Sequence, residues 1–356
     1  MIRGSMNSAD LTILIPTRNR EEHLRRLLSR ISEEIDQSGC RESVQVIIGN
    51  NASTDGTDRI AEEFQQKHAN TVVVSHVDDC GPENNILECL SFVAGTFLWI
   101  IGDDDLPVRG ILKPLLEVLK GSTPDLICLE SEWVTDTSHE RKAPLGAGLE
   151  FVSVTRLDVA KCAHISLTFI SSVILNWERL KQYVPSLLQD SFEGSRLIHF
   201  GWTLEALKIG RSFAASSKQC LLATRGNSGG YGVVTVFGNN LPKIVNATIS
   251  NTSREGKVIL RSLLWYYLPL WILAYRKTRL ASYETESLDD LEELGTKTLS
   301  YKFLLRPIAT SPLYIAELIA ILPKCYLLWL KCRARAIVGY RRLFQPPSTK
   351  LSNCAA

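Results

Sequence analysis

The chain has 356 residues, enough for two or three domain-sized units or for one large domain with an appendage. Hydrophobic residues make up 45% of the chain and the formal net charge is +2, so neither a disordered chain nor a protein devoted to nucleic acid fits this composition. The nine cysteines contain no C-x-x-C pair, which predicts reduced thiols in a cytoplasmic setting rather than a disulfide framework or a zinc site.

Positive charge collects at the C-terminal end of the chain. Residues 318–356 contain no Asp or Glu, while the rest of the chain is acidic overall. The basic residues of this segment are Lys324, Lys331, Arg333, Arg335, Arg341, Arg342 and Lys350. This distribution predicts an anionic partner or surface for the C-terminal end only.

Residues 1–10 have no apolar stretch like that of a secretory signal, and we expect a disordered N-terminus or a tag remnant there. No segment contains the ~18–20 uninterrupted apolar residues of a membrane-spanning helix, so the sequence predicts none.

Strand and helix patterns alternate over the first hundred residues. Short runs rich in β-branched residues predict strands at 11–15, 44–48, 72–75 and 97–101. Apolar residues spaced by three or four predict helices at 21–35, 58–67 and 85–94. Later patterns predict a helix at 112–119, a strand at 125–129, mixed segments, and almost only helix after residue 241.

This alternation, with short connections, predicts an α/β fold with a mostly parallel sheet flanked by helices. Ligands of such sheets bind beyond the carboxyl ends of the strands. Three loops at that edge contain polar residues, namely Thr17, Arg18, Asn19, Asn50, Asn51, Asp103, Asp104 and Asp105.

Three adjacent aspartates follow the apolar strand at 97–101. Like charges this close raise one another's pKa, and a hard cation such as Mg²⁺ or Mn²⁺ relieves that repulsion. A solvated acidic turn is the alternative interpretation, but a strand this apolar places the triplet at the ligand edge of the sheet.

Three segments together resemble the family 2 glycosyltransferases with the GT-A fold. They are residues 13–20 (ILIPTRNR), 46–57 (VIIGNNASTDGT) and 95–107 (GTFLWIIGDDDLP), and the likeness covers about residues 10–120. The chain looks similar to the bacterial polysaccharide branch that includes abequosyltransferase-like O-antigen enzymes. The resemblance implies a nucleoside diphosphate-sugar donor and Mn²⁺ or Mg²⁺ as cofactor.

The resemblance also implies roles for single residues. The first loop would shape the pocket for the base and ribose, through Pro16, Thr17, Arg18 and Asn19. Asn51 stands where relatives usually have an Asp that contacts the base, and Asp103 would contact the ribose or a sugar hydroxyl. Asp104 is implied as the metal ligand, and a shift of one residue in the alignment gives that role to Asp105.

Two positions depart from the family pattern. Many relatives have Asp-Asp where this chain has Asn50-Asn51, and Gly102 replaces the usual first acid of the metal motif. Because an Asn side chain both donates and accepts, the departure leaves the nucleobase open. The other interpretation of the two Asn residues is that they are turn residues.

An inverting transfer needs a base for the proton of the acceptor hydroxyl, and in family relatives it comes from the second half of the catalytic domain. Glu193 and Asp190 are equal candidates. His199 is weaker, because a lone His between Ile198 and Phe200 is more often a packed residue. An exposed loop acid with no role is the alternative for each carboxylate.

Aromatic and apolar residues lie beside Lys and Arg in segments 258–275 and 308–330. This pattern is typical of helices that bind a membrane surface. A helical bundle packed on the catalytic domain is the alternative. A lipid-linked glycan acceptor would account for a membrane-binding region on the inner face of the cell membrane.

The sequence thus predicts an inverting, metal-dependent sugar transferase acting on a surface polysaccharide. We expect a donor-binding half at residues 11–120, an acceptor-binding half at 121–235, and a basic, helical, membrane-associating region at 236–356. A catalytically silent nucleotide-binding scaffold of a membrane assembly complex is the alternative. A dinucleotide oxidoreductase is excluded, because the first loop lacks G-x-G-x-x-G.

Overall fold

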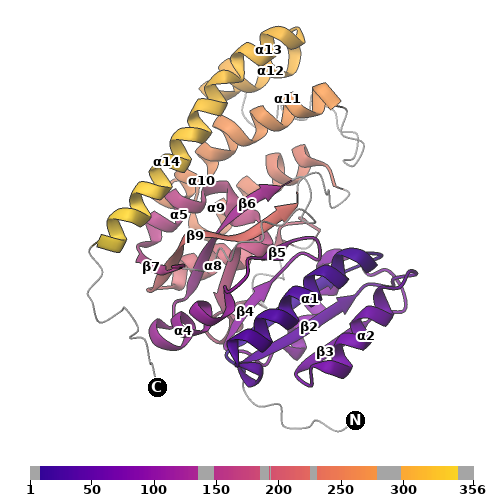
Figure 1. The fold of residues 1–356 in the computed structure, drawn as a ribbon. Coiled ribbons are helices and arrows are strands. Elements are labelled where there is room, and N and C mark those ends of the chain that lie inside the picture. The colour runs from indigo at the N-terminus through magenta and orange to yellow at the C-terminus, as the bar shows by residue number, and fades with distance from the viewer. Residues whose placement is uncertain are drawn as a thin grey trace.

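The computed structural model describes residues 9–134, 148–184, 192, 194–224, 231–278 and 298–343. Within these residues nine strands form one sheet in the order β3-β2-β1-β4-β8-β6-β9-β5, with β7 paired to β9. Helices cover both faces of the sheet, and a long helical arm extends from one end of it (Figure 1).

The first four strands pair in parallel, in the order β3-β2-β1-β4. They are β1 (Leu11–Thr17), β2 (Val44–Asn50), β3 (Thr71–Ser75) and β4 (Phe97–Ile100). Apolar and β-branched residues suit these positions, because helices bury both faces of the sheet. Thr17 pairs with Asn50 and Asn50 with Ser75, so three strands end level at the predicted ligand edge.

Three helices connect these strands, namely α1 (Glu21–Ser38), α2 (Thr57–Lys67) and α3 (Gly81–Cys89). Helix α1 buries its apolar stripe, including Leu24 and Leu27, and ends at Gly39 with a φ of 66°. Helix α3 begins four residues before the predicted start. Pro82 occupies its first turn, where the missing N–H breaks no helical hydrogen bond.

The second half of the sheet is mixed. It comprises β5 (Leu106–Pro107), β6 (Leu126–Val134), β7 (Phe151–Val154), β8 (Val173–Asn176) and β9 (Phe213–Thr224). β8 lies antiparallel to both β4 and β6, whereas β6 and β9 are parallel. The expected α/β class is confirmed, with the parallel arrangement confined mainly to the first half.

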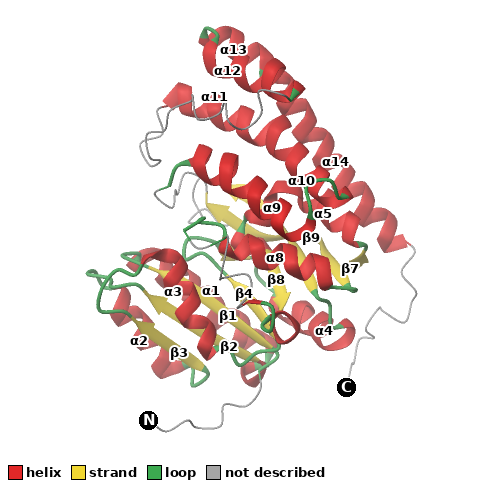
Figure 2. Cartoon of the chain, turned by 180° about the vertical axis from the view of Figure 1, so that it is seen from behind, coloured by secondary structure: helices red, strands yellow, loops and turns green. Residues whose placement is uncertain are grey.

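Shorter helices accompany this half: α4 (Leu112–Ser122), α5 (Arg156–Ala163), α6 (Trp177–Leu180) and α8 (Ile198–Ile209). Single 3-10 turns occur at Arg41–Ser43, Leu90–Phe92, His164–Thr168 and Ile170–Ser172. Helices α1, α2 and α4 cover one face of the sheet, while α3, α8 and α9 (Leu241–Ile249) cover the other (Figures 1 and 2).

The described residues after 233 are almost entirely helical, as expected. They form α9 (Leu241–Ile249), α10 (Arg254–Ser262), α11 (Leu268–Thr278), α12 (Arg306–Thr310), α13 (Leu313–Ile319) and α14 (Ile321–Leu343), with π-helical turns at Val234–Asn240, Leu263–Tyr267 and Tyr301–Leu305. One end of α14 lies against α5 and β7, and the other end projects with α11–α13 beyond the sheet (Figure 1).

Two helical stretches are long and apolar enough to cross a membrane by length and composition, Arg254–Lys277 and Leu313–Leu343. Neither stretch has the uninterrupted apolar run that the sequence prediction required, because Lys257 and Arg261 interrupt the first, and Glu317, Lys324 and Lys331 interrupt the second. The sequence interpretation treated Pro323 as one of the interruptions of segment 308–330, but α14 continues through Pro323 because this residue lies in its first turn. The first stretch is 44% buried within the protein and the second 22%.

Two apolar cores lie on opposite sides of the sheet. Leu14 belongs to one, with α3 and α8, and its neighbours Ile13 and Ile15 to the other, with α1 and α4. The first core continues into the C-terminal helices, where the Tyr266 hydroxyl lies 2.9 Å from Nδ1 of buried His164. The helical region thus packs on the α/β domain through α9, which contacts α8, and through α10 and α14, which both contact α5.

Candidate functional site

The loops after β1, β2 and β4 meet at one edge of the sheet, as the sequence predicts. The backbone N–H of Asn51 donates to the Thr17 carbonyl at 3.0 Å. The Thr17 hydroxyl in turn donates to Oδ2 of Asp103 at 2.7 Å. Residues from three separate loops are therefore in direct hydrogen-bond contact.

Residues from two later segments of the chain form hydrogen bonds with the acidic triplet. The Ser171 hydroxyl donates to Oδ2 of Asp105 at 2.6 Å and accepts from the Gly102 N–H at 2.9 Å. At the end of β9, the Thr224 N–H donates to Oδ1 of Asp105 and its hydroxyl to the Asp104 carbonyl. Because Asp105 is buried and bonded on both oxygens, the solvated-turn interpretation fails for this residue.

Burial makes the charges of the triplet costly. Desolvation raises the pKa of Asp103 to about 7, helped by the neighbouring charge of Asp104 and opposed by the hydrogen bond from Thr17. Desolvation, followed by the charge of Asp104, also raises the pKa of the Asp105 carboxyl. A bound cation favours the ionised forms of such acids, so this donor set suits a hard divalent metal.

Gly102 explains one departure from the family pattern. A Cβ at this position would lie 3.1 Å from Oδ2 of Asp105 and 3.2 Å from Oδ1 of Asp104. The two carboxylates therefore converge over the glycine, in the space that a side chain would occupy. Asp104 is the more exposed of the pair, and its position suits a ligand that reaches a metal from the protein surface.

Asn51 uses its side chain within the protein. Its Oδ1 accepts from the Cys80 N–H at 3.0 Å, and its Nδ2 donates to Oδ1 of Asp79 at 2.7 Å. Arg18 pairs with the same Asp79 carboxylate. The Gly81 N–H and then Asn51 hold the pKa of Asp79 below its usual range, so an exposed, ionised carboxylate stands beside the predicted base pocket.

Asp79 is a site residue that the sequence interpretation missed. It follows β3, the one strand of the first four whose loop was not considered, although that loop opens at the same edge. Ser171 and Thr224 were missed for another reason. They follow the triplet by 66 or more residues, and no local pattern predicts which distant hydroxyl will contact a buried acid.

Asn19 and Asn50 join the first two loops and support them. Asn19 has a φ of 52°, and its Oδ1 accepts from the Thr54 N–H at 2.7 Å. Buried Asn50 donates to Asp58 at the start of α2 and accepts from the Ser53 N–H. The turn-residue interpretation therefore suits Asn50. Pro16, the other residue implied in the pocket, lies within β1.

The candidate bases Asp190 and Glu193 lie outside the described residues. Their neighbour Phe192 is buried, and the Gly194 N–H donates to Oε2 of Glu83 at 2.8 Å. His199 lies in α8 with Nε2 2.8 Å from the Thr168 carbonyl, and burial lowers its pKa. The structure thus favours the packed-residue interpretation of His199.

The strand order, the convergent loops and the acidic triplet define a GT-A-type α/β domain. The crystal structure of S. aureus TarS 1-349 in complex with UDP has the same fold, with a TM-score of 0.54, 15% identity, and coverage of 94% of this chain and 92% of that one. The structure of the mannosyltransferase PcManGT from Pyrobaculum calidifontis in complex with GDP-Man and Mn²⁺ is also similar, with a TM-score of 0.50 and 15% identity. The match covers 94% of this chain and 87% of that one.

Residues 12–171 match the model of glycosyl transferase family 2, which supports a glycosyltransferase domain in this part of the chain. Abequosyltransferase RfbV of Salmonella typhimurium is 27% identical over 181 residues, which cover 48% of this chain and 53% of RfbV. The minor teichoic acid biosynthesis protein GgaB of Bacillus subtilis is 24% identical over 174 residues, 48% of this chain and 19% of GgaB. The chain thus spans about half the length, or less, of these curated relatives.

Proposed function

We propose that this chain transfers a sugar from a nucleoside diphosphate-sugar to a growing bacterial surface polysaccharide, with inversion at the transferred carbon. The observation that supports it most is the buried acidic triplet at the meeting point of three loops, within a family 2 glycosyltransferase domain. Structural neighbours in complex with UDP, UDP-GlcNAc and GDP-Man support this class of donor.

We assign the donor site to residues 11–120 and the acceptor site to residues 121–235. Thr17 holds Asp103 in place for the ribose or a sugar hydroxyl. Asp79 supplies the carboxylate that relatives usually have at the position of Asn51, because Oδ1 of Asn51 is bonded to Cys80 while Nδ2 of Asn51 and Arg18 orient the Asp79 carboxylate at the base pocket. A carboxylate at this place favours a base with an N–H donor on its pairing edge.

Asp104, with Asp105 beside it, would hold Mn²⁺ or Mg²⁺. The bound cation would supply Lewis-acid stabilisation of the departing diphosphate. Ser171 and Thr224 fix Asp105, so the protein maintains the carboxylate geometry before any ligand binds. A neighbour with Mn²⁺ supports a metal of this kind.

Glu193 or Asp190 would accept the proton of the acceptor hydroxyl as it attacks the sugar. The Gly194 N–H donates to Glu83 in helix α3, and this contact fixes the residue that directly follows Glu193. The contact therefore supports Glu193 as the base.

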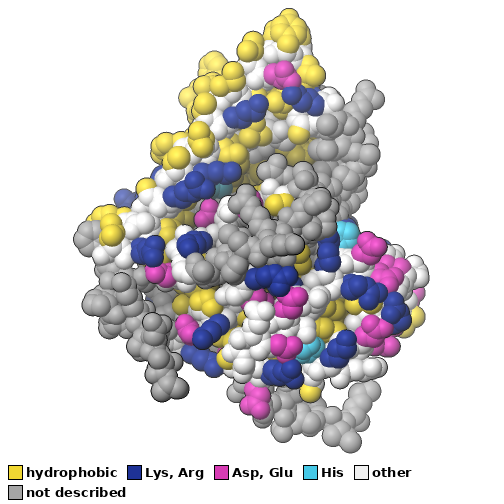
Figure 3. All heavy atoms as spheres, viewed as in Figure 1, with side chains coloured by type: hydrophobic (Ala, Val, Ile, Leu, Met, Phe, Trp, Pro, Cys, Tyr) yellow, Lys and Arg dark blue, Asp and Glu magenta, His cyan; other side chains and the backbone are white. Residues whose placement is uncertain are grey.

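A lipid-linked acceptor would bring the protein to the cytoplasmic face of the cell membrane as a peripheral enzyme. Exposed apolar side chains on α13 and α14 support this, including Leu318, Leu322 and Trp329. Figure 3 shows that apolar side chains gather along the projecting arm. Exposed Lys324 and Lys331 lie on the same helix, as anionic lipid would require.

The donor site is tested by thermal unfolding with UDP, CDP, GDP or dTDP, each with Mn²⁺ and with EDTA. We expect one nucleotide to raise the melting temperature only when metal is present. At a nucleotide concentration about 100 times its dissociation constant, the free energy of unfolding should rise by about 2.7 kcal/mol. Asp104→Asn should abolish that shift and lower the transfer rate at least about 100-fold.

Asp36→Asn, an exposed substitution on α1, is the matched control and should behave as wild type. Full metal-dependent turnover by Asp104→Asn would refute the metal assignment. Metal-dependent nucleotide binding with neither donor hydrolysis nor transfer to any polysaccharide acceptor would instead favour a catalytically silent scaffold.

A further inference from the structure

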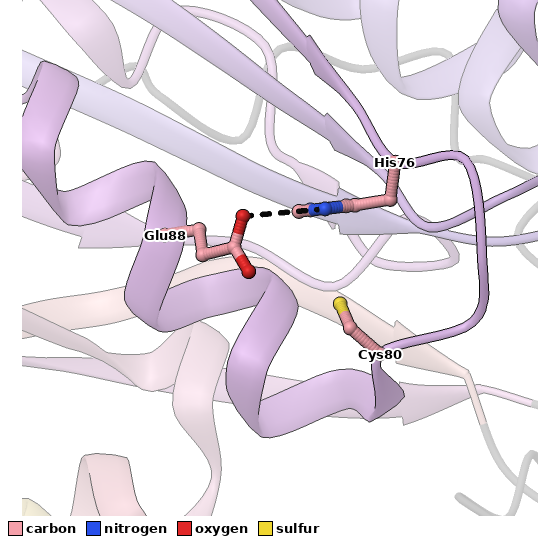
Figure 4. Close-up of side chains that lie close together, drawn as sticks. All are labelled: His76, Cys80 and Glu88. Carbon is pink, nitrogen blue, oxygen red and sulfur yellow. Dashed lines mark ion pairs between the residues drawn. The ribbon is translucent and has the colours of Figure 1, made fainter.

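A second group of metal-ligating side chains lies on the segment that links β3 to α3. His76 directly follows β3, Cys80 precedes the first turn of α3, and Glu88 lies near the end of α3. One ligand atom from each lies within 4.8 Å of the other two. Figure 4 shows the Cys80 sulfur directed toward the space between the His76 ring and the Glu88 carboxylate.

The hydrogen bonds of Asn85 fix the proton on the His76 ring. The Asn85 Nδ2 donates to the Gly49 carbonyl at 2.9 Å, so its Oδ1 is the atom that faces Nε2 of His76 at 3.1 Å. Nε2 must therefore donate. In the neutral ring this leaves Nδ1 with a lone pair, which faces the Glu88 carboxylate at 3.3 Å.

Nδ1 of His76 and the Glu88 carboxylate lie 3.3 Å apart, and a metal ion bound to both atoms would bridge them. The Cys80 thiol donates to Oδ1 of Asn51 at 3.3 Å, and its sulfur lies within 4.8 Å of the other two ligand atoms, where as a thiolate it would be a strong ligand for a borderline-soft ion.

We propose that His76, Cys80 and Glu88 bind a zinc ion through Nδ1, Sγ and a carboxylate oxygen. Tetrahedral zinc holds such ligand atoms about 3.5 Å apart, so small side-chain rotations would close the site. Asn85 is the outer residue that orients the imidazole, an arrangement typical of zinc-bound histidine. The Glu88 side chain is 58% exposed, which leaves a fourth position open to water.

This site would fix the β3–α3 segment against the second loop. The Cys80 N–H donates to Oδ1 of Asn51, and the His76 N–H donates to the Asn50 carbonyl at 3.0 Å. Asp79 lies between the two ligands in sequence. Zinc would therefore order the segment that holds Asp79, whether or not this chain transfers a sugar.

The absence of C-x-x-C in the sequence excludes only sites built on paired cysteines. Here the ligands follow the spacing H-x₃-C-x₇-E, with one residue of each type. That spacing is not a recognised zinc signature, and the structure is needed to bring the three side chains together.

The test is titration of the purified, chelator-treated full chain with Co²⁺ and Zn²⁺. Co²⁺ bound to a thiolate gives charge-transfer absorption in the near ultraviolet, whereas Co²⁺ at the all-carboxylate triplet gives none. We expect this band to saturate at one Co²⁺ per chain and to disappear when Zn²⁺ is added. Cys80→Ser should remove the band, and Glu88→Gln should weaken Zn²⁺ binding at least about tenfold.

Cys40→Ser and Glu62→Gln are the matched controls, and both should retain the band and the wild-type affinity. Absence of the band in a wild-type chain that melts cooperatively would overturn the proposal and leave only the direct contact between His76 and Glu88. A band that persists in Cys80→Ser would also overturn it. Loss of nucleotide binding in Asp104→Asn, with the band intact, would separate this site from the proposed donor site.

Discussion

Burial sets the chemistry of Asp103. Its pKa of about 7 in the folded chain lies above the value of an exposed Asp, so between about pH 4 and pH 7 the folded state binds a proton that the unfolded state has lost. Without metal, the free energy of unfolding should therefore fall as pH rises through this range, by up to about 1.4 kcal/mol for each pH unit.

Asp103→Asn should reduce this slope, because an amide has no charge to desolvate. Urea unfolding in EDTA at pH 5 and at pH 7 measures the effect. Asp105 contributes a slope of the same sign, so part of the pH dependence should remain in the variant. An Asp103→Asn protein with the full wild-type slope would show that Asp103 is ionised throughout the range.

Ser171 stabilises the triplet through two hydrogen bonds. Ser171→Ala would leave Oδ2 of Asp105 and the Gly102 N–H without this partner, which should lower the free energy of unfolding by about 1–3 kcal/mol. It should also reduce the stabilisation by nucleotide and Mn²⁺ in thermal unfolding, because the Asp105 carboxylate is no longer fixed.

Ser172→Ala is the matched control. The Ser172 hydroxyl is also buried but donates to the Phe169 and Ser166 carbonyls rather than to the triplet. Its loss should affect stability without reducing the response to nucleotide and metal. Equal loss of that response in both variants would mean that general destabilisation, and not the Asp105 contact, is responsible.

The sequence located the triplet and Thr17 because each directly follows an apolar strand, and the ends of parallel strands must meet. It did not predict that Asn51 would be bonded internally or that Asp79 would stand beside it. Those contacts depend on how the β3–α3 segment turns back over the second loop. Such a turn depends on side-chain packing rather than on the local pattern of apolar residues.

At the scale of elements, two adjacent arginines attach α14 to the α/β domain. Arg341 donates twice to Oδ2 of Asp158, at 3.0 and 2.6 Å, whereas Arg342 pairs with the exposed Glu150. Asp158 also forms the capping box of α5 with Thr155 and is nearly buried. Arg333 also donates to the Lys161 carbonyl, so at least three of the seven basic residues of the C-terminal segment are engaged within the protein.

Arg341→Ala should lower the free energy of unfolding by about 1.5–3 kcal/mol, because it removes charged hydrogen bonds from a nearly buried carboxylate. Arg342→Ala should leave stability unchanged within error, because both members of its pair are exposed to solvent. Urea unfolding monitored by tryptophan fluorescence compares the two variants. Equal effects would show that α14 is not attached through Asp158.

Element boundaries were predicted least well where tertiary contacts extend an element. The strand expected at 125–129 continues to Val134 because β6 pairs with β9 along most of its length. The mixed pairing around β8 was also not predictable from the sequence. A short buried strand has the same composition in either direction, and only its connections determine how it pairs.

At the scale of the whole molecule, the C-terminal region has two distinct surfaces. Its inner side continues the apolar core of the α/β domain, as the packed-bundle interpretation requires. The outer side of α13 and α14 leaves Leu318 and Leu322 more than 60% exposed. The two interpretations of this region are therefore compatible, since one surface packs on the protein while the other is available to lipid.

Association with lipid is tested by co-sedimentation of the full chain with vesicles. Wild type should bind vesicles rich in anionic lipid and bind neutral ones more weakly, with salt reducing the difference, because the charges of Lys324, Lys331 and Arg335 are exposed. A double variant, Leu318→Glu with Leu322→Glu, should bind at least about tenfold more weakly, because two apolar side chains no longer enter the interface.

Val77→Glu is the matched control, because Val77 is 94% exposed but lies far along the chain from the helical arm. It should bind as wild type does. Binding of the double variant at wild-type strength would refute this surface. A protein that alkaline wash does not release from membranes would instead indicate that Leu313–Leu343 crosses the bilayer, since its length and composition permit this. Release by alkali and by high salt would support an enzyme held at the surface by charge and by the shallow insertion of one helical face.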